Sequence, residues 1–306
     1  MDTGDILQQI HNGDPRSIGR AISLLENHAA CAGEILQGLD RSRIESSFVL
    51  GITGPPGAGK STLTSRIVNR LRQQEQRVGI IAVDPSSPVS GGALLGDRIR
   101  MMDHARDRQV VVRSMATRGK LGGLCAAAGA AVRILAASGC ETVIIETVGI
   151  GQSEMDIVRL ADISVLVLAP GFGDEIQAMK AGILEVADLL VVNKADRPDA
   201  EKLVLHLGAA LQNDAEQKPR LLQTVASENR GVNELVQRLQ DMEKQYRLDG
   251  TLSRRRSRSA ALETLDWTLE LLRPRLKERI AGQEKGIDPR LEAEEIIRQL
   301  VGDRKK

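Results

Sequence analysis

The sequence predicts an α/β fold built around a doubly wound, mainly parallel sheet, and two patterns carry this prediction. Between residues 48 and 239, short runs rich in Val, Ile and Leu alternate with amphipathic stretches long enough for helices. Most of the short runs are continuously apolar, as expected for parallel strands that are buried on both faces. The helical stretches between them imply right-handed crossovers, which place helices on both sides of one sheet.

Each expected element follows from this alternation. The predicted strands are 48–53, 78–83, 110–115, 142–147, 163–169, 189–192 and 221–225. A helix is expected over about residues 62–74, directly after the first strand and a glycine-rich loop. Residues 1–46 are expected to form a helical N-terminal extension in which Asp14-Pro15 starts a helix, and residues 246–306 a helical C-terminal extension.

The loop after the first strand matches G-x-x-x-x-G-K-S/T, and its place between strand and helix is that of a phosphate-binding loop. Its glycines let main-chain N–H groups curl around a β-phosphate. Lys60 can reach the β- and γ-phosphate oxygens, and the Ser61 hydroxyl can ligate Mg²⁺. The residues expected to contact the nucleotide here are Gly54, Pro55, Pro56, Gly57, Ala58, Gly59, Lys60, Ser61 and Thr62. Residues 47–245 are therefore predicted to be a P-loop domain.

Acidic residues follow other predicted strands, at the sheet edge where ligands bind in such folds. Asp84 ends the second strand, Glu146 ends the fourth, and Asp97 lies in a glycine-rich loop. With Ser61, these three carboxylates form the expected Mg²⁺ site. The alternative is structural: Asp84 would begin a proline turn and Asp97 would cap a helix.

Gly149 and Gln152, which follow the fourth strand, are expected to act on the γ-phosphate and its attacking water. The Gly149 N–H would sense this phosphate, and its loss on hydrolysis would release the loop. Gln152 could orient the attacking water. The expected catalytic set is Lys60, Asp97, Glu146, Gly149 and Gln152.

The segment Asn193-Lys194-Ala195-Asp196 follows the sixth strand and predicts which nucleotide base is bound. The Asp196 carboxylate can accept from N1–H and the exocyclic amine of guanine, whereas adenine presents an acceptor at N1. Asn193 would brace the loop and reach the base, and the stem of Lys194 would lie along the ring. The sequence therefore predicts GTP and GDP as substrate and product, and a GTPase domain over 47–245.

Composition argues against a nucleic-acid partner and favours a reducing, cytoplasmic location. The net charge of +1 and an aromatic content of 1% argue against a nucleic-acid partner. The three cysteines show no C-x-x-C spacing, which favours a reducing compartment. No signal segment or membrane span is expected, so the predicted location is cytoplasmic.

The predicted C-terminal arm begins with the basic run 254–258, which favours a solvated helix start over an RNA-binding patch. Leucines then recur at spacings of three and four, as in a helix seam. These are Leu262, Leu265, Leu269, Leu272 and Leu276. The stripe would pack either against a second copy of the chain or back on its own domain.

Several segments together resemble the MeaB/ArgK family, the methylmalonyl-CoA mutase-associated GTPases within the SIMIBI class of P-loop G proteins. They are 83–88, 96–98, 116–119, 146–154 and 193–196, and the resemblance covers most of the chain. It implies a chaperone for an adenosylcobalamin-dependent acyl-CoA mutase, which gates cofactor loading and protects or reactivates the mutase. Adenosylcobalamin would lie on that partner and not on this chain. A homodimer through the C-terminal helices, an adenosyltransferase as a further partner, and a mobile switch over 170–180 are also implied.

One departure and one rival reading accompany this resemblance. The family usually has Thr-Ser-Ala after its last core strand, whereas this chain has Thr224-Val225-Ala226. The Ala226 N–H is still expected to bond guanine O6, but the missing hydroxyl puts the rigidity of the loop in question. The rival reading is a P-loop kinase or ATPase that phosphorylates a periplasmic transport component. Nickel insertion is disfavoured because the four histidines are dispersed.

Overall fold

The structure is a computed structural model of the 306-residue chain. It describes residues 2–27, 29, 31–84, 107–116, 126–147, 153–171, 183–211, 221–281 and 288–302. The chain divides into two compact units, Met1–Ser259 and Ala260–Lys306.

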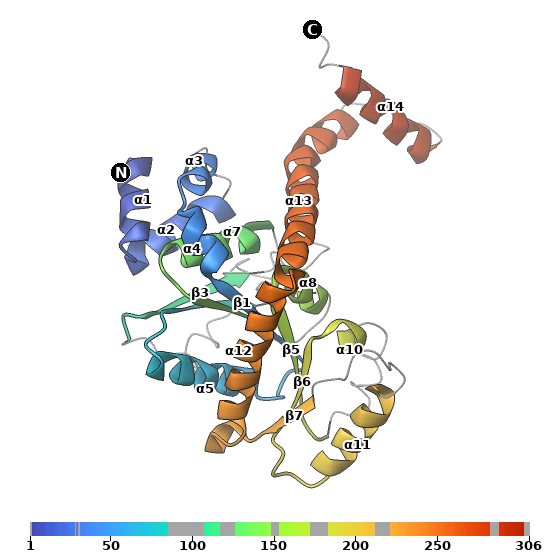
Figure 1. Ribbon diagram of the computed structural model, residues 1–306. Coiled ribbons are helices and arrows are strands. Elements are labelled where there is room, and N and C mark those ends of the chain that lie inside the picture. The colour runs from blue at the N-terminus through green and yellow to red at the C-terminus, as the bar shows by residue number, and fades with distance from the viewer. Residues whose placement is uncertain are drawn as a thin grey trace. The chain divides into compact units, whose positions relative to one another are not determined.

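In the described residues, the first unit contains one sheet with the strand order β3-β2-β4-β1-β5-β6-β7 (Figure 1). Every pairing in it is parallel. The strands are β1 (Phe48–Thr53), β2 (Val78–Asp84), β3 (Val110–Ala116), β4 (Thr142–Thr147), β5 (Ile163–Leu168), β6 (Leu189–Asn193) and β7 (Leu221–Thr224). Each strand agrees with its expected range to within one residue at either end. The predicted α/β fold with a parallel sheet is confirmed.

Helices cover both faces of this sheet. Those of the first unit are α1 (Thr3–His11), α2 (Pro15–Glu26), α3 (Ala32–Gln37), α4 (Arg41–Ser46), α5 (Lys60–Gln73), α7 (Ala126–Ala137), α8 (Ser153–Leu160), α10 (Ile183–Val186), α11 (Ala200–Leu211), the 3₁₀ turn η2 (Ala226–Glu228) and α12 (Val232–Leu248). α5 and α12 pack on one face, and α7, α8 and the N-terminal helices pack on the other (Figure 1). α13 (Thr251–Ala281) begins in the first unit, and α14 (Pro289–Gly302) lies in the second.

The alternation along β1 shows how the central strand serves both cores. Leu50 and Ile52 are buried against α5 and α12, while Val49 faces the opposite core. Gly51 allows α8 to approach β1 closely, because a Cβ at this position would lie 2.5 Å from Cγ2 of Ile157. A larger side chain at Gly51 would push α8 away from the strand that leads into the phosphate-binding loop.

Hydrogen bonds from Arg43 connect the N-terminal helices to the rest of the first unit. Arg43 donates to the carbonyl oxygens of His11 (2.8 Å) and Ala137 (3.2 Å), which joins α1, α4 and α7. Asp14 caps α2 by accepting from the Ser17 N–H at 2.7 Å, as the Asp-Pro pattern predicted. This hydrogen bond lowers the pKa of the Asp14 carboxyl below its ordinary value.

The basic run at the start of α13 is a helix start as predicted, but the prediction that it is solvated is wrong for two of its arginines. Arg255 makes a two-pronged ion pair with Asp188, with N–O distances of 2.5 and 2.8 Å. Arg256 pairs with Asp162 in the same way, at 2.8 and 2.6 Å. The carboxylates of Asp188 and Asp162 are only 4% and 3% exposed. Such paired forks with buried carboxylates are structural contacts within one domain.

Asp162 connects this helix start to the beginning of the central strand. Its carboxylate also accepts from the Val49 N–H at 2.8 Å, and Arg256 donates to the Glu45 carbonyl oxygen at 2.7 Å. Burial alone would lower the pKa of the Arg256 guanidinium, but the hydrogen bonds and the attraction of Asp162 outweigh it and hold this pKa above its usual value. The sequence did not show these pairs because their members lie far apart in the chain, 67 residues for Arg255 and Asp188 and 94 for Arg256 and Asp162.

Replacing Arg256 with Met should destabilise the fold, because it leaves the buried Asp162 carboxylate without its cation. We expect the free energy of unfolding, measured by urea denaturation, to fall by about 2 to 3 kcal/mol. Arg254→Met is the matched control, since Arg254 donates to groups nearby in the chain, the Asp249 carbonyl oxygen and the Thr251 hydroxyl. Equal stability of the two variants would contradict this role of the ion pair.

Candidate nucleotide-binding site

The loop between β1 and α5 adopts a conformation that its glycines make available. Gly54 and Gly59 have φ angles of 140° and 88°, in the region that favours glycine. A Cβ at Gly54 would lie 2.0 Å from the Val167 carbonyl oxygen, and one at Gly59 would lie 2.4 Å from Nδ2 of Asn193. The loop therefore passes directly against β5 and against the end of β6.

Lys60 begins α5, and its side chain is held within the loop. Its ammonium donates to the carbonyl oxygens of Gly54 at 2.8 Å and Pro55 at 2.9 Å, and the residue is buried. The positive charge is therefore fixed against the loop whose main-chain N–H groups are expected to cradle phosphate. A triphosphate would meet both features at once.

The structure brings together Ser61 and Glu146, two of the predicted Mg²⁺ ligands. The Ser61 hydroxyl donates to Oε1 of Glu146 at 2.5 Å, and Glu146 is buried. The register of β1 and β4 explains this contact, because Ile52 lies opposite Glu146 one residue before β1 ends. A hydroxyl and a carboxylate oxygen at the phosphate loop are hard ligands that fit Mg²⁺.

The other predicted metal and catalytic residues are less fully described. Asp84 ends β2, two residues beyond the position that pairs with Glu146, so its main chain lies at the same edge of the sheet. Asp97, Gly149 and Gln152 lie outside the described residues, as does most of the predicted switch over 170–180. Among the residues that are described, no group of three or more His, Cys, Asp or Glu side chains is arranged to hold a metal ion.

Asn193 joins three loops at the carboxyl edge of the sheet. Its Nδ2 donates to the Ala58 carbonyl oxygen at 2.9 Å in the phosphate loop. Its Oδ1 accepts from the Thr224 hydroxyl and the Ala226 N–H, both at 3.1 Å. The side chain braces the loops as expected, and its contact with a base remains a prediction.

The residues after Asn193 leave Asp196, the residue expected to bind the base, exposed to solvent. Lys194 has a φ of 57°, and its ammonium donates to the Gly57 carbonyl oxygen at 2.6 Å. The Ala195 N–H donates to the Thr224 carbonyl oxygen at 3.1 Å. Asp196 follows, exposed, at the same sheet edge as the phosphate loop. Its carboxylate is therefore accessible to a base whose phosphates occupy that loop.

The Ala226 N–H, in the loop after β7, has a partner within the protein. The Ala226 N–H, predicted to bond guanine O6, donates to Asn193 in this structure. A bond from this N–H to the base would have to share it with the Asn193 oxygen. A second contact was not predicted at all: Arg66 of α5 donates to the carbonyl oxygens of Ala226 and Ser227. No motif marks this arginine, because its partners lie 160 and 161 residues away.

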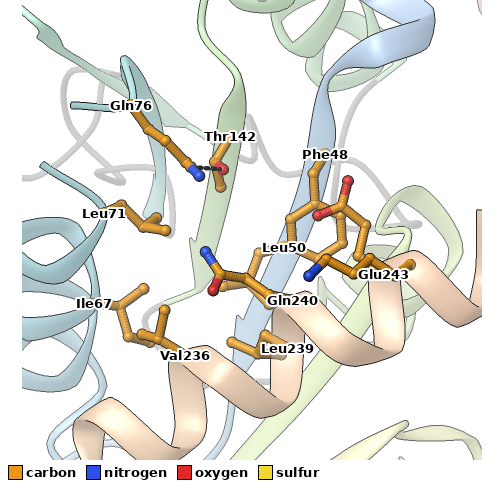
Figure 2. A pocket seen from close by; sticks show the side chains of 11 residues that line it. Phe48, Leu50, Ile67, Leu71, Gln76, Thr142, Val236, Leu239, Gln240 and Glu243 are labelled. Atoms are coloured by element: carbon orange, nitrogen blue, oxygen red, sulfur yellow. Dashed lines mark hydrogen bonds between the residues drawn. The ribbon is translucent and has the colours of Figure 1, made fainter. Parts of the chain in front are cut away.

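A separate cavity of about 240 Å³ lies at the opposite edge of the sheet. Figure 2 shows its lining side chains, which come from α5, α12, the first half of β1, the first residue of β4, and Gln76 between α5 and β2. Phe48 and Thr142 begin these two strands, whereas the phosphate loop follows the last residue of β1. The cavity is therefore distinct from the nucleotide site.

The fold and this site define a P-loop GTPase. The family described as methylmalonyl Co-A mutase-associated GTPase MeaB matches residues 18–285, and the chain belongs to that family. A relative in Pyrococcus abyssi is 38% identical over 314 residues, with 97% of each chain covered. GTPase ArgK of Escherichia coli is 33% identical over 272 residues, covering 85% of this chain and 81% of its own length.

A solved structure named LAO/AO transport system kinase shares this fold. It has a TM-score of 0.66 and 27% identity, and the similarity covers 92% of this chain and 85% of that one. The family and these relatives establish the chain as a GTP hydrolase of the MeaB/ArgK group. None of the described helices is both long enough and apolar enough to cross a membrane.

Asp196→Asn should change the preferred base from guanine to xanthine, whose C2 carbonyl accepts where guanine donates. We expect the ratio of the dissociation constants for XDP and GDP to fall by about a hundredfold or more in calorimetric titrations. Asp199→Asn is the control, because its carboxylate lies in the same loop but pairs with Lys202 at 2.7 Å. An Asp196 variant that binds GDP and XDP as the unaltered protein does would remove Asp196 from base recognition.

Proposed function

We propose that this GTPase is a chaperone for an adenosylcobalamin-dependent acyl-CoA mutase of the methylmalonyl-CoA mutase type. In this proposal it hydrolyses GTP to gate cofactor loading and to protect or reactivate the mutase, in the cytoplasm. The observation that carries the proposal is the family match over residues 18–285, since that family is described by its association with methylmalonyl-CoA mutase. Adenosylcobalamin would be held by the mutase, and an adenosyltransferase would be a further partner.

The geometry supports hydrolysis by in-line attack of water on the γ-phosphate. Lys60 and the main-chain N–H groups of the loop would stabilise the charge that develops on the β- and γ-phosphate oxygens. Ser61 and Glu146 would hold Mg²⁺, with Asp84 and Asp97 as further proposed ligands. Bound Mg²⁺ neutralises charge on the β- and γ-phosphate oxygens. Gln152 would orient the attacking water.

The contact between Ser61 and Glu146 supports a link between the nucleotide and the segment after β4. Glu146 lies one residue before the end of β4, and the segment that follows contains Gly149, the proposed γ-phosphate sensor. Ser61 and Glu146 would both help to hold the metal, so their present contact would depend on whether nucleotide and metal are bound. A change of nucleotide state would therefore alter the anchoring of this segment, which is how P-loop switches act on partners.

A second candidate is a P-loop kinase that phosphorylates a transport component. The name of the structural relative, LAO/AO transport system kinase, supports it. The two candidates differ in the acceptor of the γ-phosphate. A GTPase transfers it to water, whereas a kinase transfers it to a protein side chain. Nothing in the phosphate loop itself separates these reactions, because both need the same positioning and charge stabilisation.

The decisive experiment follows radiolabelled γ-phosphate with purified mutase, with a periplasmic binding protein, and with neither. We expect slow release of inorganic phosphate that rises about tenfold or more with the mutase, because the partner completes the site. Lys60→Ala should abolish hydrolysis in every mixture, which controls for contaminating phosphatases. Label on the binding protein, with no effect of the mutase, would favour the kinase and overturn the chaperone proposal.

We also propose that the chain forms a homodimer through its C-terminal helices. In the second unit, Leu265 and Leu269 from the predicted leucine stripe are 53% and 52% exposed. Apolar side chains repeated along one helix in this way are suited to a second helix with the same pattern. Sedimentation at micromolar concentration should give a dimer, and Leu265→Glu with Leu269→Glu should give a monomer. A monomer of the unaltered chain would contradict the proposal.

A further inference from the structure

The side chain of Arg66 bridges the helix after the phosphate loop and the turn after the last strand. Its Nε donates to the Ala226 carbonyl oxygen at 3.1 Å, and its Nη2 donates to the Ser227 carbonyl oxygen at 3.2 Å. We propose that Arg66 is a positioning residue for guanine recognition, which holds this turn so that one of its N–H groups meets the base. The inference rests on the assignment of the site to a guanine nucleotide.

Among the described residues of the turn, the exposed side carries an ion pair between Arg230 and Glu228 at 3.7 Å, and both side chains are largely exposed. Residues 227–230 are exposed, while Val225 and Ala226 are buried. The Val225 N–H donates to the Arg230 carbonyl oxygen at 3.0 Å, and the Arg230 N–H donates back at 3.2 Å. Val225 has no hydroxyl with which to fix the turn further. Arg66 supplies two side-chain hydrogen bonds where residue 225 can supply none.

The two carbonyl contacts act together with the 3₁₀ hydrogen bonds of the turn to orient its N–H groups. Within the turn, the Glu228 N–H donates to the Val225 carbonyl oxygen at 3.0 Å and the Asn229 N–H to the Ala226 carbonyl oxygen at 3.3 Å. In a planar trans peptide, the N–H points away from the carbonyl oxygen of the same unit. Because Arg66 draws the Ala226 and Ser227 carbonyls to its own side, the N–H groups of residues 227 and 228 point away from it. The Ala226 N–H, one residue earlier, points to Asn193. The Ser227 N–H is therefore the group that we assign to the base, next to the bond that Ala226 gives to Asn193.

An N–H at this position selects by the chemistry of the purine six-position. Guanine carries an acceptor there, O6, whereas adenine carries an amino group that donates. A correctly placed donor favours guanine and is left unsatisfied by adenine. Arg66 thus acts through the turn to favour guanine over adenine, the same selectivity that Asp196 is expected to provide at the other edge of the base.

The guanidinium suits this role better than an ammonium. Arg presents several N–H donors in a fixed fork, which can hold two adjacent carbonyl oxygens at once. Lys presents a compact charge on a flexible stem and would reach one of them at a time. Arg66→Lys should therefore restore only part of the function that Arg66→Met removes.

The test uses the full chain with Arg66→Met, Arg66→Lys and the control Arg70→Met. Arg70 lies one turn further along α5 and contacts Gln73 at 3.1 Å, not the turn after β7. We expect the KM for GTP and the Kd for GDP to rise about tenfold in Arg66→Met, with kcat unchanged, and about threefold in Arg66→Lys. Arg70→Met should match the unaltered protein.

A nucleotide analogue distinguishes positioning from general support of the fold. In 6-thio-GDP the O6 acceptor is replaced by sulfur, a weak acceptor, while N1–H and the amino group remain. The unaltered protein should bind 6-thio-GDP about tenfold more weakly than GDP, and Arg66→Met should lose most of this difference. Arg66→Met weakening both nucleotides equally, or binding GDP as tightly as before, would overturn the role of Arg66. Equal binding of GDP and ADP by the unaltered protein would instead overturn the guanine assignment.

Discussion

The organisation of the site depends on one buried amide, the side chain of Asn193. It donates to the phosphate loop at Ala58 and accepts from Thr224 and Ala226 of the turn after β7. A buried amide that makes three hydrogen bonds is costly to displace, because each freed partner would be left without water. The phosphate-binding and base-binding loops are thereby held in a fixed relation. A nucleotide that contacts both loops meets a preformed site and spends less binding energy on ordering them.

The two edges of the sheet have different chemical roles. At the carboxyl edge, Lys60, Ser61 and Glu146 gather the charges and oxygen ligands that a triphosphate and its metal need. At the amino edge, Asp162 and Asp188 receive the guanidinium forks of Arg256 and Arg255. These pairs fix the start of α13 to β1, β5 and β6, the strands whose other ends lead to the nucleotide loops.

The turn after β7, residues 225–230, shows how a fold can supply contacts that a motif lacks. Val225 removes the side-chain hydroxyl that the family pattern provides, and the sequence alone suggested a looser turn. In the structure, Arg66 from α5 and Asn193 from β6 hold the turn from two sides. The same tertiary setting engages the Ala226 N–H with Asn193, so the next N–H is the better candidate for the base. Local sequence could not show either contact, since both join segments far apart in the chain.

The sequence by itself determined the seven strands, the phosphate loop, the acid near the end of β4 and the Asn-Lys-x-Asp segment, because each depends on local patterning and on spacing from a strand. Buried parallel strands are continuously apolar, and a loop that approaches phosphate closely needs glycine. Only the tertiary structure decided that Arg255 and Arg256 are paired rather than solvated, and that Arg66 reaches the turn after β7. Those contacts depend on which strands become neighbours. A helical or strand period describes which residues face inward, but not which distant residue they meet there.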